Sequence, residues 1–380
     1  MTKIGLVGAG ARGTSHLRSV YTLREQEYFL NERGGGYPQW TYEEFVDPAD
    51  HPEWVEHVGD MMPEVTAIFD PSEESRANAV AICGEHGHTP ATYSDFEAFI
   101  DDGSFEAAVV ASPNHAHAEQ AIALLTHDIP VLSEKPIATT LRDHDRIADA
   151  VDSSSATYFV GFNLRSAPFY TRLQSMLAAG KIGELGMISC RECRGHFAGR
   201  YSFARERSGG AILNKNCHDF DLYNWYAESD PVSVVAYGGQ HVHDRNTDVM
   251  DHATVSVRYA NDVVGTLELC LYAPFGERTR MYELRGSTGI LRAPDEQHTV
   301  DLYRRGSTDR FTVSARGGGH GGADVRQMKR FLQCLEGQTD PPASVEDAKK
   351  ADVIALAAQQ AVREDRQVHI DGDYDIVDDS

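Results

Sequence analysis

The sequence predicts an α/β protein of two domains: a doubly wound parallel sheet, then an α+β domain with an open, mostly antiparallel sheet. In the first half, short buried-type strands alternate with helical segments, which is typical of a parallel sheet. In the second half, apolar and polar residues alternate along several runs, which indicates a sheet with one covered face. With 380 residues, 41% of them hydrophobic, the chain can fill two cores, which we place at residues 1–165 and 166–380.

The elements of the first domain are expected to follow one another as strand and helix. We expect strands at residues 3–7, 65–69, 107–111, 130–132 and 157–162. We expect helices directly after the first strand and at residues 75–83, 93–101, 115–126 and 141–151. Ser94 is a candidate cap for the helix at 93–101.

The second domain shows its strands by alternation. Leu267, Leu269 and Leu271 share one side of a strand at 265–271, with polar residues between them. Similar strands are expected at residues 232–237, 254–259, 281–285, 300–303 and 311–314. Two helices follow, one with Val325, Met328, Leu332 and Leu335 on its apolar face, the other with Ser344 and Asp347 as a capping box.

The charge of the chain restricts its partners. A formal net charge of −23 argues against nucleic acid and anionic membrane surfaces. No apolar run is long enough for a membrane span, and the N-terminal residues lack the layout of a signal peptide, so we expect a cytoplasmic protein. The cations are almost all arginine, with seven lysines in total. An acidic, lysine-poor surface predicts a halophilic protein; the alternative is an acidic protein without that adaptation.

Cysteine usage points to no metal or redox site. The six cysteines are scattered, and Cys190 and Cys193 form a C-x-x-C pair in a strand-like stretch with no second pair. We therefore expect ordinary free thiols in a reducing compartment, and no bound metal.

A glycine-rich turn gives the main indication of function. Gly8-Ala9-Gly10-Ala11-Arg12-Gly13 is a G-x-G-x-x-G motif that follows a strand and opens a helix. Glycines permit the tight turn and let backbone N–H groups approach a pyrophosphate, and the helix N-terminus favours its negative charge. The turn therefore predicts dinucleotide binding; the alternative is a glycine turn used only for packing.

The second requirement is an acid that binds the adenosine ribose. Asp70 ends the second strand, and an anion there repels a 2′-phosphate, so NAD is favoured over NADP. Arg12 and Arg76 keep NADP open. Gly13 and Asp70 lie 57 residues apart (70 − 13), against roughly 20 in the usual fingerprint. We interpret residues 24–60 as an insertion that is a lid, an oligomer contact or a passive surface excursion.

Two further motifs end strands of the same sheet. Ser112 and Asn114 follow one strand, and Glu134 and Lys135 follow the next. Because ligands bind beyond the carboxyl ends of parallel strands, we expect all of them to face the dinucleotide. A lysine beside a cationic nicotinamide ring can take part in proton transfer to a hydroxyl. The alternative for Lys135 is a surface ion pair with Glu134.

The densest polar cluster of the second half is residues 209–221. In a helix, His218 shares a face with Asp221 and with Lys215. Histidine is a suitable proton relay near neutral pH, although a lone histidine is often structural. We favour a functional His218, because it lies close to a glycine pair and among several polar groups.

Together these residues resemble the Gfo/Idh/MocA family, named after glucose–fructose oxidoreductase and inositol dehydrogenase. The resemblance covers nearly the whole chain: residues 8–13, 112–114, 134–136, 161–165, 209–221 and 344–347. It implies a Rossmann domain followed by an open, mostly antiparallel sheet that covers the nicotinamide. It also implies a sugar, polyol or cyclitol substrate, and a homodimer or homotetramer.

The resemblance also implies residue roles. Lys135 matches the family's catalytic lysine, and His218 matches the histidine that orients or deprotonates the reacting hydroxyl. The family's acid four residues before that histidine is Asn214 here, and its glycine is Asn216. Asparagine cannot take a proton, so Lys215 or Asp219 is a candidate replacement. The substrate-binding candidates are Asn163, Arg165, Asn214, Lys215 and Asp221.

The leading hypothesis is hydride transfer between a nicotinamide and a CH–OH group, with Lys135 and His218 converging on the reactive carbon. A redox-neutral sugar hydrolase or epimerase that keeps its NAD is the first alternative. A non-catalytic dinucleotide sensor is the second, and Asn214 favours it slightly.

Overall fold

The structure is a computed structural model that describes residues 2–31, 62–195, 204–242, 249–273, 278–294, 299–313 and 322–377. Most of the insertion expected at 24–60 lies outside these residues. The chain forms two compact units. The first consists of Met1–Ala138, Arg142–Ala167 and Ser314–Val345, and the second of Thr139–Leu141, Pro168–Val313 and Glu346–Ser380. Neither unit is continuous in sequence, unlike the spans 1–165 and 166–380, because a segment near the C-terminus returns to the first unit.

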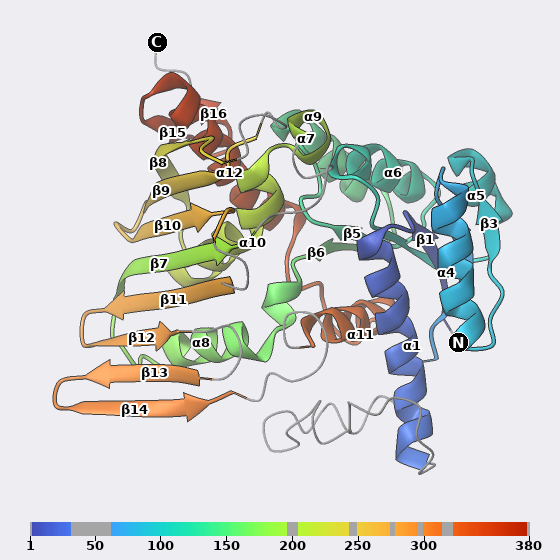
Figure 1. The fold of residues 1–380 in the computed structure, drawn as a ribbon, viewed down its shortest axis with the longest axis horizontal. Helices are drawn as coiled ribbons and strands as arrows, with labels where there is room; N and C mark the ends of the chain where they lie inside the picture. The colour runs from blue at the N-terminus through green and yellow to red at the C-terminus, as the bar shows by residue number, and fades with distance from the viewer. Residues whose placement is uncertain are drawn as a thin grey trace. The chain divides into compact units, whose positions relative to one another are not determined.

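The sheet of the first unit has six described strands in the order β3-β2-β1-β4-β5-β6, and every pair is parallel (Figure 1). The strands are β1 (Lys3–Val7), β2 (Glu64–Phe69), β3 (Ala91–Tyr93), β4 (Ala107–Val110), β5 (Val131–Glu134) and β6 (Tyr158–Gly161). The order reverses between β1 and β4. This confirms the doubly wound sheet and places the ligand-binding edge at the carboxyl ends of these two strands.

The helices of this unit cover both faces of the sheet. They are α1 (Ala11–Asn31), α4 (Glu73–Glu85), α5 (Phe96–Asp102), α6 (Asn114–Thr126), α7 (Leu141–Ser153), η1 (Asn163–Ser166) and α11 (Ala323–Leu335). Right-handed crossovers put α1 and α6 on opposite faces. α11 joins the face of α1, where Phe331 packs edge-on against Phe159 of β6 with ring centroids 5.7 Å apart.

One expected helix begins later than predicted. Tyr93 ends β3, which pairs with β2 through Phe69, so it is not helical. α5 starts at Phe96, and its cap is Asp95, not Ser94: the Asp95 carboxylate accepts a hydrogen bond from the Ala98 amide at 2.9 Å. Tyr93 is in strand conformation because its pairing with β2 outweighs the helical pattern of the residues that follow it.

The second unit has a sheet of ten described strands in the order β14-β13-β12-β11-β7-β10-β9-β8-β15-β16. Among these described strands, β7 and β10 form the one parallel pair, and the other pairs given by the register are antiparallel. The strands are β7 (Leu185–Arg194), β8 (Pro231–Gly239), β9 (His252–Tyr259), β10 (Val264–Cys270), β11 (Arg278–Gly286), β12 (Gly289–Ala293), β13 (Thr299–Arg304), β14 (Ser307–Thr312), β15 (Val368–Ile370) and β16 (Ile376–Val377). The predicted open, mostly antiparallel sheet is confirmed.

Helices cover one face of this sheet. They are α8 (Pro168–Ala178), α9 (Arg205–Ser208), α10 (Ala211–Ala227) and α12 (Val345–Glu364). Leu267, Leu269 and Leu271 are buried as the alternation predicts, and the hydroxyl of Tyr223 on α10 donates to the Thr266 carbonyl at 2.6 Å. Among the described helices, none has the length and apolarity needed to cross a membrane.

Candidate active site

The three glycines of the turn have three different reasons to be glycine. Gly8 has φ +92°, and a Cβ there would lie 2.6 Å from the Ser112 nitrogen. A Cβ on Gly13 would lie 1.9 Å from the Gly8 carbonyl oxygen, so this glycine lets the helix pack on the turn. A Cβ on Gly10 would meet nothing within 4 Å. Gly10 therefore leaves open space directly before α1, where the helix N-terminus attracts an anion.

Asp70 lies beside this turn. One carboxylate oxygen accepts from the Ala9 amide at 2.8 Å and the other from the Ser72 amide, also at 2.8 Å. Ala9 therefore ties the turn to the end of β2, and Asp70 is held next to the glycines, as a ribose-binding acid requires. Arg76 donates to the main-chain oxygen of Asp70 at 2.6 Å, which draws this cation towards the backbone.

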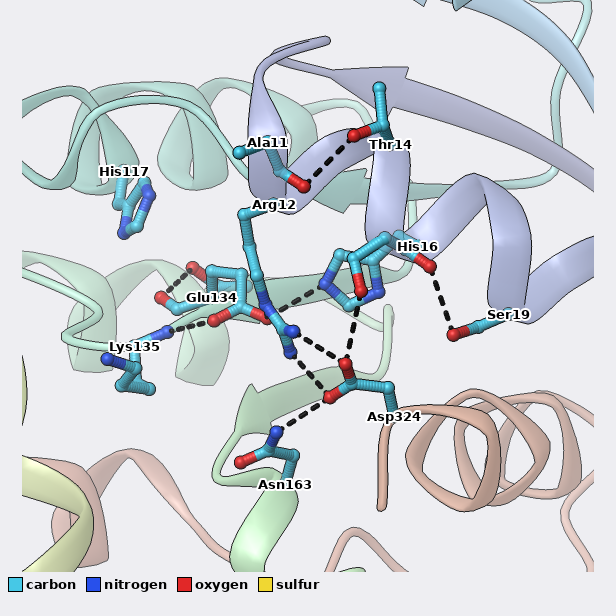
Figure 2. A network of polar contacts seen from close by, with 12 residues as sticks. Ala11, Arg12, Thr14, His16, Ser19, His117, Glu134, Lys135, Asn163 and Asp324 are labelled. Carbon is cyan, nitrogen blue, oxygen red and sulfur yellow. Dashed lines mark hydrogen bonds and ion pairs between the residues drawn. The ribbon is translucent and has the colours of Figure 1, made fainter. Parts of the chain in front are cut away.

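The side chain of Arg12 bridges two buried carboxylates (Figure 2). Its Nε donates to Glu134 at 2.6 Å, and its two terminal nitrogens donate to the two oxygens of Asp324 at 2.8 and 3.0 Å. Glu134 ends β5 and Asp324 lies in the first turn of α11. The guanidinium thus neutralises acids of its own unit, which weakens the argument that Arg12 binds a 2′-phosphate. Ala11 and Arg12 still open α1, so their amides lie at its N-terminus.

Other polar groups complete this network. His16, one turn after Arg12 on α1, contacts Glu134 through Nε2 at 2.8 Å. Asp324 also accepts from the Ser15 hydroxyl at 3.1 Å and from the Asn163 amide at 2.7 Å.

The electrostatics of the network favour two ionised acids. Burial alone would raise the pKa of Glu134, but Arg12, His16 and Lys135 hold it well below its ordinary value. Burial likewise opposes ionisation of Asp324, yet Arg12 and the Asn163 amide lower its pKa. The pKa of Arg12 is raised by the same two carboxylates, although burial opposes this. The cluster is therefore a set of ion pairs at neutral pH.

Lys135 directly follows β5 and is half-buried. Its amide donates to the Glu134 carboxylate at 3.3 Å. The alternative of a surface ion pair does not fit, because Glu134 is only 3% exposed and its carboxylate also binds Arg12 and His16. The neighbouring strand β6 lies close to the end of β5, because a Cβ on Gly161 would lie 2.7 Å from the Ser133 carbonyl oxygen.

The other candidates of the first unit have defined positions. Ser112 follows β4, and its hydroxyl donates to Gln120 at 2.5 Å. Asn114 opens α6 and is buried. Asn163 and Arg165 are buried in η1; Asn163 donates to Asp324, and Arg165 donates to the Pro342 carbonyl at 2.5 Å. The contacts of Ser112, Asn163 and Arg165 stabilise the unit itself.

The cluster of the second unit lies on α10, which begins at Ala211, earlier than Cys217. Asn214, Lys215, His218 and Asp221 are therefore all helical, and Lys215 is the half-buried member. The preceding glycine pair has a packing role. Gly209 and Gly210 both have positive φ, and the Gln359 side chain occupies the space of a Cβ on Gly210 and donates to the Gly209 carbonyl at 3.1 Å.

Asp219 is the centre of a buried network. Its carboxylate binds Arg280 at 2.9 and 3.1 Å, and it accepts from Asn216 at 2.9 Å and from Tyr282. Asn216 also donates to Glu192 of β7 at 2.9 Å. Burial opposes ionisation of Glu192, but Arg280, Arg194 and Lys215 lower its pKa to about 2. Asp219 is therefore occupied by structural contacts, which argues against it as a replacement for the missing acid at Asn214.

The cysteine pair is also structural. Cys190 donates to Asp219 at 3.5 Å, and Cys190 and Cys193 are both free thiols. Burial raises the pKa of both, so neither is an activated thiolate.

Comparison with known families agrees with this geometry. Residues 2–162 match the model of the oxidoreductase family with an NAD-binding Rossmann fold, GFO_IDH_MocA. Residues 170–292 match the GFO/IDH/MocA C-terminal domain. The chain belongs to the GFO/IDH/MocA family of NAD-binding oxidoreductases.

Several named relatives are similar over much of their length. The chain is 26% identical to myo-inositol 2-dehydrogenase of Thermotoga maritima over 73% of this chain and 84% of that protein. It is 26% identical to inositol 2-dehydrogenase of Rhizobium meliloti over 77% and 88%. The match to the putative oxidoreductase YteT of Bacillus subtilis, at 29% identity, covers 46% of this chain and 42% of that protein. A solved structure of levoglucosan dehydrogenase with NADH and L-sorbose shares the fold, with a TM-score of 0.80 and 20% identity over 98% of this chain and all of that chain.

Sequence reasoning missed three residues of the first unit. His16 had a local signal, because it lies one turn after Arg12 on the same helix face. His117 lies in the first turn of α6, three residues after the cofactor-binding candidate Asn114. Asp324 had no local signal, because its partners are more than 150 residues away in sequence.

The glycine turn provides a matched pair of variants. We expect Gly10→Ala to fold as stably as the wild type but to bind NAD at least ~10-fold more weakly, because the methyl group fills the space a pyrophosphate needs. Gly13→Ala should lose folding stability as well, since its Cβ would overlap the Gly8 carbonyl. Thermal unfolding and isothermal titration with NAD measure both effects. Unchanged NAD affinity in a folded Gly10→Ala protein would contradict the assignment of the turn.

The Asp324 carboxylate should show in the pH dependence of stability. Asp324→Asn is expected to lower the free energy of unfolding at pH 7 by about 1.5–3 kcal/mol, as for other hydrogen bonds to charged groups. The folded pKa of Asp324 lies below its ordinary value of 3.8, so its contribution is present above that pH and is lost as the pH falls through the folded pKa. The difference between variant and wild type should therefore shrink in acid.

Denaturant unfolding between pH 3 and pH 8 measures this difference. Asp309→Asn is the control, because Asp309 pairs with Arg304 on the surface, where an ion pair contributes about 0–1 kcal/mol. Equal, pH-independent effects of the two substitutions would be evidence against a buried Arg12–Asp324 pair.

Proposed function

We propose that this chain is an NAD-dependent dehydrogenase that oxidises a sugar, polyol or cyclitol hydroxyl, with Lys135 as its proton relay. The observation that carries the proposal is the position of Lys135. It follows β5 at the carboxyl edge of the parallel sheet, and Glu134 beside it is joined to the glycine turn through Arg12. The names of the inositol and levoglucosan dehydrogenases among the similar proteins support the substrate class.

The residues of the turn fit NAD. The space before α1 and the amides at its N-terminus suit a pyrophosphate, and Asp70 beside them suits the two hydroxyls of the adenosine ribose. NAD, when bound, supplies the acceptor for the hydride. The carboxylate of Asp70 repels a 2′-phosphate, and Arg12 and Arg76 have partners within the protein, so NAD is favoured over NADP.

The groups of this chain then handle the substrate proton. Lys135 takes the proton of the reacting hydroxyl as a general base and returns it in the reverse direction. We assign His218 as the second group that orients or deprotonates this hydroxyl. Asn214 holds a hydroxyl but takes no proton, and Lys215 is the remaining candidate to compensate for it. Asn163, Arg165 and Asp221 complete the proposed substrate-binding set.

Composition supports three further properties. The net charge of −23 and the low lysine content favour a halophilic protein, and the free cysteines favour a reducing compartment such as the cytoplasm. The family resemblance favours a homodimer or homotetramer. Circular dichroism and light scattering in 0.1 M and 2 M KCl test halophily and the oligomeric state, since a structure indifferent to salt would argue against halophily.

We expect Lys135→Met to keep NAD affinity and to lower kcat by at least ~10²-fold, the lower limit for a positioned acid–base group. The assay follows NADH formation with a panel of sugars, sugar acids and cyclitols in high KCl. Lys181→Met, an exposed lysine, is the matched control and should keep wild-type kcat. Wild-type turnover in Lys135→Met would remove Lys135 from the mechanism, and turnover without net NADH would favour a redox-neutral reaction.

His218→Ala tests whether the two groups serve one step. If Lys135 and His218 act on the same hydroxyl, the loss in kcat of the double variant should be clearly smaller than the product of the two single losses. Multiplicative losses would show that the two residues act independently.

A further inference from the structure

His117 of α6 lies between two main-chain carbonyl groups. Its Nδ1 is 2.8 Å from the Pro136 oxygen, and its Nε2 is 2.7 Å from the Ser112 oxygen. The side chain is almost completely buried, at 1% exposure. Figure 2 shows the ring near Glu134 and Lys135, on the same side of the polar network. Neither the proposed catalytic step nor the cofactor contacts described above use this histidine.

The two carbonyls lie where the sheet ends. β4 and β5 are paired as far as Val110 and Ser133, and the register gives no pair between them beyond that point. Ser112 follows β4 and Pro136 follows β5, so the imidazole links the two chain segments just past the last paired residues. Within this stretch, Glu134 still pairs with Gly161 of β6. Lys135 is thus held between the last pair of β5 on one side and the Pro136 carbonyl on the other.

The chemistry of this link is specific to histidine. A carbonyl oxygen only accepts, so the ring donates to both carbonyls when both of its nitrogens carry a hydrogen, and to one of them when it is neutral. Burial lowers the pKa of His117 below its ordinary value, although the two carbonyls and the Glu134 carboxylate favour the charged ring. No other side chain of this size donates in two opposite directions from one flat ring. An amide carries both of its donor hydrogens on one nitrogen, so it does not span the two carbonyls as the ring does, and an aliphatic side chain donates to neither.

We propose that His117 is a positioning residue: by holding the Ser112 and Pro136 carbonyls past the end of the β4–β5 pairing, it fixes Lys135 at the edge of the sheet. The inference deepens the proposed function, because it rests on Lys135 as the proton relay. In this proposal His117 acts through Lys135 and not on the substrate.

The first experiment compares His117→Leu and His117→Gln with His144→Leu. His144 is equally buried, at 1% exposure, but lies on α7, so its removal controls for a general loss of stability. We expect His117→Leu to lower kcat by at least ~10-fold through misplacement of Lys135, with the dissociation constant for NAD changed less than ~3-fold. His117→Gln should recover part of kcat, and His144→Leu should keep it, at a comparable loss of thermal stability.

The second experiment does not need turnover. The chain has seven lysines, so side-chain signals of 13C-labelled lysine can be resolved by NMR and Lys135 identified with Lys135→Met. In the NAD-bound protein at constant pH, His117→Leu should change the chemical shifts of the Lys135 side chain and leave the signals of the other six lysines unchanged.

The outcomes separate the two proposals. A folded His117→Leu protein with wild-type kcat, or with an unchanged Lys135 signal, would overturn the positioning role. If the wild-type chain itself turned over none of the substrates, the proposed function would fail, and the NMR comparison would still decide whether His117 positions Lys135.

Discussion

The first unit depends on one cation placed between two buried acids. Glu134 at the end of β5 and Asp324 at the start of α11 are both almost fully buried, and an isolated buried carboxylate costs several kcal/mol. Arg12 removes this cost by binding both. Because Arg12 belongs to the glycine turn, its ion pairs link the turn to the strand end that carries Lys135 and to α11. The same ion pairs that stabilise the fold therefore position the groups expected to bind NAD and move a proton.

In the second unit, buried acids next to α10 are likewise satisfied by partners within the protein. Asp219 and Glu192 are buried, and Arg280 and Asn216 satisfy them with charge-assisted hydrogen bonds. These hydrogen bonds attach α10 to Glu192 of β7 and to Arg280 of β11. Lys215 on the same helix is half-buried. In both units, buried acids with partners in the protein lie close to a half-buried lysine, Lys135 in the first and Lys215 in the second. Asn216, at the position of the family glycine, is part of this structural network.

Local patterns predicted what local physics determines. Buried-type strands alternating with helices predicted the first sheet, and alternation with period two predicted the second. The glycine spacing predicted a turn in which Gly8 and Gly13 leave no room for a Cβ and Gly10 leaves open space. Asp70 was found because it directly follows a strand. Contacts between residues far apart in the sequence could not be predicted from local patterns. Arg12 was assigned to the cofactor because it lies between glycines, yet its side-chain partner Asp324 is distant in sequence. The glycine pair at 209–210 counted in favour of a functional His218, although the Gln359 side chain explains Gly210. Asp95 replaced Ser94 as a cap because strand pairing moved the helix start.

The coupling between the glycine turn and α11 is the central claim, and a double-mutant cycle measures it most directly. The dissociation constant for NAD would be determined for the wild type, Arg12→Met, Asp324→Leu and the double variant by isothermal titration. If the pair holds the turn, each single variant weakens binding and the double variant is no weaker than the worse single one, so that the losses are strongly non-additive. Losses in binding free energy that simply add, or wild-type affinity in both single variants, would contradict the account.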